Sequence, residues 1–182
     1  ESDAGLRGVT IGSSVPLHLV GQKSLVTGLD LSGDLFGADR SEAWMGSVYD
    51  AVSGYGTGPT GKGQWADRLG ATGASSIRLA GDLRPVFSPE LPNASVASQL
   101  TLVARLINAN LGIRVFNVSL GSFDTHDGQA GPHQALLADL NAGITAFYAT
   151  LSSTWNKRVA MMTSIDSAAR FPTMSQEVTV SR

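Results

Sequence analysis

The segment from Ile113 to Thr163 constrains the fold more than any other part of the chain. It begins with a short run of β-branched and aromatic residues, Ile113–Leu120, which ends at Gly121 and is typical of a buried strand. A polar loop, a long helical pattern from about Pro132 to Leu151 and a second apolar run, Arg158–Thr163, follow in turn. Strand, helix and strand in this order predict a right-handed crossover between parallel strands. We therefore expect α/β architecture, with a partial parallel sheet and flanking helices.

Three helices are expected before this segment, and the first and third have apolar residues at helical spacing. The first is Ser41–Val52, capped by Ser41. The second is a short helix at the start of Gln64–Leu79, followed by a strand-like piece, Ser76–Leu79. The third is Val96–Asn110, capped by Asn93 or Ser95. Asn110–Gly112 is a helix stop of the left-handed kind. Pro85, Pro89 and Pro92 predict an irregular crossing between the second and third helices.

The chain is expected to have three parts. Residues 1–94 are rich in glycine and form the loop-rich N-terminal part of the domain, with one or two short strands before Ser41. Residues 95–164 form a core of helix, strand, loop, helix and strand, and residues 165–182 form an aberrant tail. His18 stands alone between two leucines, and since an isolated histidine is seldom a ligand, we interpret it as packed or solvent-facing.

Composition excludes several classes of function. At 182 residues the chain has the length of one domain, and its net charge of -2 gives no reason to expect nucleic acid as a partner. No apolar run approaches the roughly 20 residues of a membrane span. No signal peptide is recognisable, so any export signal is expected outside these residues. The absence of cysteine excludes disulfides, thiolate metal sites and a cysteine nucleophile.

Gly56–Gly63 has the spacing of a phosphate-binding loop as far as Gly61 and Lys62. The next residue is Gly63, so the hydroxyl group that would bind Mg²⁺ is missing. The segment also follows a predicted helix and not a strand, and Pro59 removes one backbone amide. We interpret it as a surface loop and not as a nucleotide site.

The polar loop after the first strand holds the candidate site. Asp124 and His126 are two residues apart, so in an extended backbone both side chains point to one side. A carboxylate oxygen and an imidazole nitrogen suit Zn²⁺ or Mn²⁺. Asp127, Gln129 and His133 follow closely and would complete the ligand set or orient it. At least one further ligand would have to come from a distant segment.

The same loop is compatible with a purely structural turn. Asp124 would then accept hydrogen bonds from the backbone amides of Thr125 and His126, and His133 would lie on the surface of the following helix. No base is paired in the sequence with any nearby hydroxyl group, so the catalytic nucleophile stays unknown. The residue pattern leaves a metal or catalytic site and a structural turn both open.

The loop and its surroundings resemble a known bacterial family. The segments that carry the resemblance are Gly121-Ser-Phe-Asp-Thr-His-Asp-Gly-Gln129, His133, Leu136-Leu137-Ala-Asp-Leu140 and Ala146-Phe147-Tyr148. They are similar to the domain of unknown function 1501 family, which is grouped with the alkaline phosphatase and sulfatase-like α/β hydrolases. The resemblance extends from about Ser95 to Thr163.

This resemblance implies a metal-dependent hydrolase of phosphate or sulfate esters that acts on a small anionic substrate. It implies an alkaline phosphatase/sulfatase-like sheet and a divalent metal, Zn or Mn. Asp124 and His126 carry over as metal ligands, with Gln129 and His133 as substrate-binding residues. The family also implies export to the periplasm or the extracellular space, often with a twin-arginine signal.

Two departures from the family pattern bear on activity. The family's Gly- and Asp-rich first strand is absent, and the Asp-His pair expected after Ser164 never arrives. We therefore expect an inactive fragment of the hydrolase. Our hypothesis for residues 165–182 is a frameshift, because Ser167–Glu177 read one frame over permits the family's expected continuation. The alternative, from another class, is a non-catalytic exported binding or scaffold module in which the loop is structural.

Overall fold

The computed structural model of the protein divides the chain into two compact units. One unit, here called the sheet unit, comprises Glu1–Leu31 and Pro89–Arg182, and the other, the helical unit, comprises Ser32–Ser88. The residues that the structure describes are 6–12, 14–21, 25–35, 37, 39–56, 58, 61–87, 91, 95–123, 128–166 and 175–181.

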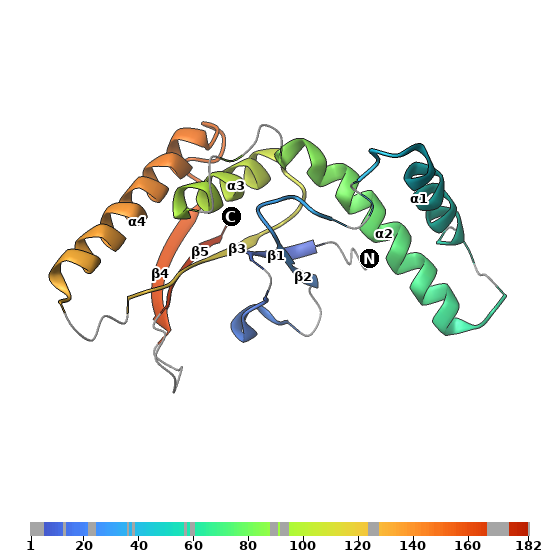
Figure 1. Ribbon diagram of the computed structural model, residues 1–182, viewed down its shortest axis with the longest axis horizontal. Helices are drawn as coiled ribbons and strands as arrows, with labels where there is room; N and C mark the ends of the chain where they lie inside the picture. Colours follow the sequence, from blue (N-terminus) through green and yellow to red (C-terminus); the bar gives the residue numbers. More distant parts are fainter. Residues whose placement is uncertain are drawn as a thin grey trace. The chain divides into compact units, whose positions relative to one another are not determined.

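Five described strands form one mixed sheet in the sheet unit, in the order β2-β1-β3-β5-β4 (Figure 1). They are β1 (Leu6–Ile11), β2 (Leu25–Leu29), β3 (Val115–Leu120), β4 (Ala160–Asp166) and β5 (Ser175–Ser181). β1 pairs in parallel with β2 and β3, whereas β5 pairs antiparallel with β3 on one side and β4 on the other. β3 and β4 therefore run in the same direction, as predicted, but they are not neighbours.

The α/β prediction is confirmed, and the prediction of a parallel sheet is wrong for the strands on one side of β3. The reason is β5, which belongs to the part of the chain predicted as an aberrant tail. Val178 and Val180 of β5 are fully buried and align with Val118 and Phe116 of β3. Burying this alternating apolar pair places an antiparallel strand between the two predicted ones.

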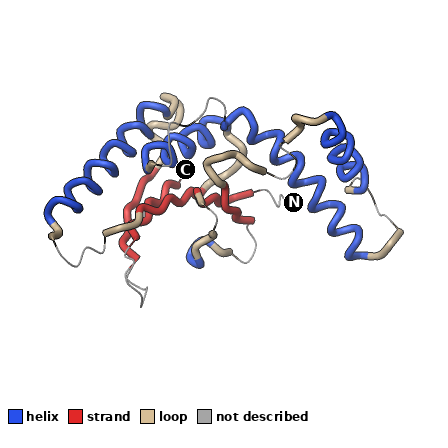
Figure 2. Tube along the Cα trace, in the orientation of Figure 1, coloured by secondary structure: helices blue, strands red, loops and turns tan. Residues whose placement is uncertain are grey.

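One face of the sheet forms the core together with α3 (Val96–Ala109), on which α4 (Ala130–Thr150) packs. Figure 2 shows both helices on the same side of the strands. The residues that share this face of the three central strands are buried: Val9, Ile11, Phe116, Val118, Val178 and Val180. The predicted stripe of α3 faces the core and is fully buried at Leu100, Val103, Ala104 and Ile107. Apolar burial on one face thus fixes the sheet against its helices.

The ends of α3 follow their predicted signals. Ser95 is the N-cap, and its hydroxyl oxygen accepts a hydrogen bond from the backbone amide of Ser98 at 3.3 Å. Asn110 ends the helix in the left-handed conformation, with a φ of 55°. α4 begins at Ala130, two residues before the predicted start at Pro132.

Replacing Ser95 with alanine is expected to lower the free energy of unfolding by about 1 kcal/mol, because the amide of Ser98 loses its partner in the first turn of α3. Urea denaturation followed by circular dichroism measures the change. Ser153→Ala removes an exposed hydroxyl group beyond α4 and serves as the control. Equal denaturation midpoints for the two variants would contradict the proposed role of the cap.

The helical unit contains α1 (Ala43–Tyr55) and α2 (Gln64–Phe87). The predicted cap by Ser41 is wrong: Glu42 is the N-cap of α1 and makes no side-chain cap. The backbone amide of Ser41 instead donates to the Asp39 carboxylate at 2.9 Å, so Ser41 belongs to the preceding turn. Residues 58 and 61–63, between the two helices, are exposed, and Gly56 at the end of α1 is half-buried, in agreement with a surface loop.

The strand-like piece predicted within α2 is also wrong, because Ser76–Leu79 is helical. Four residues of α2 are buried at every third position: Ile77, Ala80, Leu83 and Val86. The helix continues through Pro85, which lies in its last turn and removes only one intrahelical hydrogen bond. Among the described residues, no helix combines the length and the apolar character needed to cross a membrane.

Candidate functional site

The candidate site lies at the edge of the sheet where the parallel strands β1, β2 and β3 end. From β1 the chain continues to β2 on one side, whereas from β3 it continues to β4 on the other side (Figure 1). The strand order therefore changes direction between β1 and β3. In open α/β sheets, ligands bind in the crevice outside the carboxyl ends of the strands at such a point. The loop that follows β3 begins here.

The structure describes the two ends of this loop. Gly121, Ser122 and Phe123 leave β3, and Ser122 has a φ of 74°, a left-handed conformation that is uncommon for a residue other than glycine. The predicted metal ligands Asp124 and His126 lie in residues 124–127, outside the described residues. Their roles stay predictions.

Gln129 and His133, the predicted substrate-binding residues, lie together at the start of α4. Gln129 is the exposed N-cap residue, and its carbonyl oxygen accepts a hydrogen bond from the backbone amide of His133 at 3.0 Å. The two residues are thus one helical turn apart.

His133 connects α4 to the end of β3. Its Nε2 lies 3.1 Å from the carbonyl oxygen of Phe123, and the two rings are tilted with centroids 6.1 Å apart. Since a carbonyl oxygen only accepts hydrogen bonds, a hydrogen bond at this contact requires the tautomer with the proton on Nε2. A backbone carbonyl that orients a histidine in this way is common around metal and substrate sites.

A row of polar side chains crosses the centre of the sheet on the face away from α3. Asn117 of β3 is fully buried; its Nδ2 donates to Thr10 Oγ1 at 3.4 Å, and its Oδ1 accepts from Thr179 Oγ1 at 3.4 Å. The row links three adjacent strands, β1, β3 and β5. The sequence prediction treated Asn117 as part of an apolar strand and missed this contact, although one amide within an apolar run was a visible signal.

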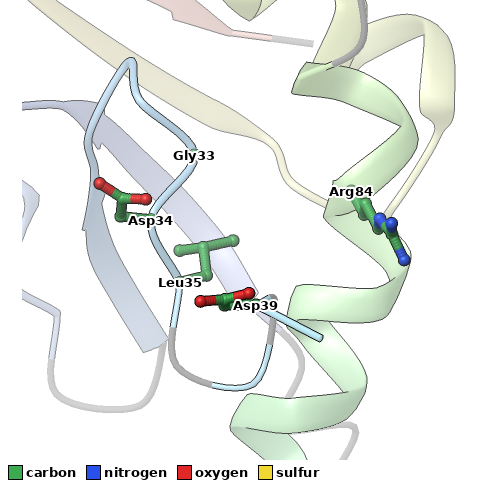
Figure 3. Close-up of a pocket in the computed structure, with 5 residues that line it drawn as sticks. All are labelled: Gly33, Asp34, Leu35, Asp39 and Arg84. Atoms are coloured by element: carbon green, nitrogen blue, oxygen red, sulfur yellow. The ribbon is translucent and has the colours of Figure 1, made fainter. Parts of the chain in front are cut away.

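The helical unit contains a cavity of about 520 Å³ on the loop that leads to α1. Figure 3 shows the carboxylates of Asp34 and Asp39 on this loop, with the side chain of Arg84 extending away from both of them. Hydrogen bonds from Ser41, first from its backbone amide and then from its side chain, lower the pKa of Asp39. Since both aspartates are exposed, this cavity is a solvated polar hollow.

The donors predicted for a metal fit the chemistry of zinc or manganese, since Asp124 offers oxygen and His126 offers nitrogen. Among the described residues, no three histidine, aspartate or glutamate side chains gather where they could hold a metal ion. No family model, curated protein or solved structure matches this chain.

Proposed function

We propose that this chain carries part of the active centre of an exported, metal-dependent hydrolase of phosphate or sulfate esters, similar to alkaline phosphatase and sulfatase-like enzymes. The observation that supports the proposal most is the position of the loop after β3. It leaves a central strand of the sheet beside the point where the strand order changes direction, and its sequence holds a carboxylate and an imidazole two residues apart.

Asp124 and His126 are the metal ligands in this proposal. The metal, when bound, polarises the ester and stabilises the charge that develops on its oxygens. The side-chain amide of Gln129 donates a hydrogen bond to an ester oxygen from the start of α4. The positive end of the α4 dipole lies at the same place and favours an anionic substrate.

His133 positions the substrate in the same proposal. The contact of its Nε2 with the carbonyl oxygen of Phe123 fixes the orientation of the ring and therefore the position of Nδ1.

The ligand set is incomplete in this proposal. Catalytic zinc sites have three protein ligands, and Asp124 and His126 supply two. We therefore expect the chain alone to bind metal weakly and to be inactive as a hydrolase. The site is for this reason tested by metal binding and not by hydrolase activity.

Adding Zn²⁺ or Mn²⁺ is expected to raise the melting temperature of the chain, and Asp124→Ala or His126→Ala is expected to abolish this rise. A metal that binds only the folded state stabilises it by about 2.7 kcal/mol at 100 times its dissociation constant. Differential scanning calorimetry over a series of metal concentrations measures the effect.

Asp82→Ala, which removes an exposed carboxylate on α2, is the control and is expected to keep the full rise. If the wild-type chain shows no rise, or if all four proteins show the same rise, the loop does not bind metal. The non-catalytic binding or scaffold module then becomes the better description.

A further inference from the structure

A cavity of about 570 Å³ lies in the sheet unit at the amino ends of β1 and β3. Its walls come from the first residues of these strands, from β2 and from the turn that follows β1. β3 has six residues that each rise by about 3.3 Å, so this end of the strand is about 20 Å from the loop at its carboxyl end. The cavity is therefore separate from the candidate site after β3.

Two arginines from neighbouring strands line this cavity. Arg7 and Arg114 directly precede Gly8 and Val115, which are register partners in β1 and β3. The backbone amide of Arg114 donates to the carbonyl oxygen of Arg7 at 2.8 Å, which fixes the two residues side by side.

A β-bulge sets the direction of Arg7. Leu6 and Gly8 of β1 pair with the consecutive residues Leu25 and Val26 of β2, so Arg7 is an extra residue between them. Bulges change the direction of a side chain relative to the regular alternation of a strand. Nη1 of Arg7 donates to the carbonyl oxygen of Gly112 at 3.2 Å and holds the guanidinium at this edge of the sheet.

The turn after β1 supplies the opposite wall. It is a 3-10 turn, η1 (Leu17–Leu19), and Figure 1 shows it in blue on the side of the sheet away from α3. His18 of this turn is exposed and lines the cavity. Arg7 and Arg114 both line the cavity, and the positive charges of their guanidinium groups attract a negatively charged ligand.

The rest of the wall is apolar. Leu19, Val26 and Val115 are half-buried around the cavity. A Cβ atom at Gly8 would lie 3.0 Å from Cγ2 of Val26, so glycine at this position keeps the space open. Cavities of about 300–1,000 Å³ with apolar walls and a few polar groups are typical of sites for small organic molecules.

We propose that this cavity binds a small organic anion with an aryl or acyl body. The acid group lies between the guanidinium groups of Arg7 and Arg114, whose planar shape matches the oxygens of a carboxylate or a phosphate. The apolar body lies against Leu19, Val26 and Val115. This site goes beyond the proposed hydrolase centre and does not depend on a metal.

Isothermal titration calorimetry with 4-phenylbutyrate, and with 4-phenylbutyramide as its uncharged counterpart, tests the proposal. The acid is expected to bind saturably and the amide is expected not to bind. Phenyl phosphate in a parallel titration shows which acid group the arginines prefer. Arg114→Gln is expected to weaken binding of the acid about tenfold, because one charge-assisted hydrogen bond is lost.

Arg158→Gln changes an exposed arginine elsewhere in the sheet unit and is expected to leave the affinity unchanged. Amide chemical shifts locate the ligand: Gly8 and Gly21 are expected to move, and Gly131 on α4 is expected to stay. Circular dichroism verifies that the variants are folded. The proposal is overturned if neither acid binds, if the amide binds as well as the acid, if Arg114→Gln binds like the wild type, or if the shifts lie outside the cavity.

Discussion

Phe116→Ala is expected to lower the free energy of unfolding by about 3–5 kcal/mol, the usual cost of removing a fully buried aromatic side chain. Phe116 lies in β3 with none of its surface exposed, between Val9 of β1 and Val180 of β5. Truncation leaves a void that the neighbouring strands cannot close, because their hydrogen-bonded register holds them in place. Chemical denaturation, with the slope of the transition checked for each variant, measures the loss.

Met162→Ala is the matched control for Phe116→Ala. Met162 lies in β4 of the same sheet but is 61% exposed, and substitutions at such positions usually change stability by about 0.5 kcal/mol or less. A loss of similar size in both variants would show that β3 is not the centre of the core.

Gly143→Ala is expected to lower the free energy of unfolding by about 1–3 kcal/mol, the typical cost of overpacking a close contact. Gly143 is where α4 approaches α3: a Cβ atom there would lie 2.8 Å from Cγ1 of Val96 and 3.1 Å from Cδ1 of Leu100. The helices must separate to admit the methyl group. Thermal unfolding followed by circular dichroism measures the change.

The same helix offers an internal control at Gly131. A Cβ atom at that position would meet no other atom within 4 Å, so Gly131→Ala adds helix propensity without a clash. It is expected to stabilise the chain by up to about 1 kcal/mol or to leave it unchanged. If Gly143→Ala behaves like Gly131→Ala, the α3–α4 contact is not limited by the size of residue 143.

Local signals in the sequence predict much of the fold. α3 has an apolar stripe, a serine cap and a left-handed stop at Asn110, and all three are confirmed. The strand before the polar loop and the helix after it are confirmed in type, with ends that differ by about two residues. These elements are predictable because each depends on residues that are close together in the chain.

The elements that depend on distant residues are the ones that the sequence prediction missed. The tail contains Val178 and Val180 at alternating positions, but only their alignment with β3 shows that they belong to a strand within the sheet. The frameshift hypothesis for residues 165–182 stays a prediction. Similarly, Ser76–Leu79 has the composition of a strand, but it lies inside a helix that continues to Phe87.

The structure describes two of the residues predicted for the candidate site, Gln129 and His133. His133 lies in the first turn of α4, whereas Gln129, predicted within the loop, is the N-cap of this helix. Asp124 and His126 fall outside the described residues, so their roles stay predictions. The arginine-lined cavity was not predicted, because Arg7 and Arg114 are far apart in the sequence. The β-bulge that changes the direction of Arg7 also has no recognisable local sequence pattern.

The insertion of β5 between β3 and β4 has a consequence for how the sheet unit folds. β3 is bordered on one side by residues 6–11 and on the other by residues 175–181, so its two neighbours are separated by most of the chain. Closing such large loops costs entropy before any contact compensates for it, which slows folding. During synthesis, α3, β3 and α4 are made well before β5. One edge of β3 therefore stays unpaired until β5 emerges from the ribosome and forms hydrogen bonds with it.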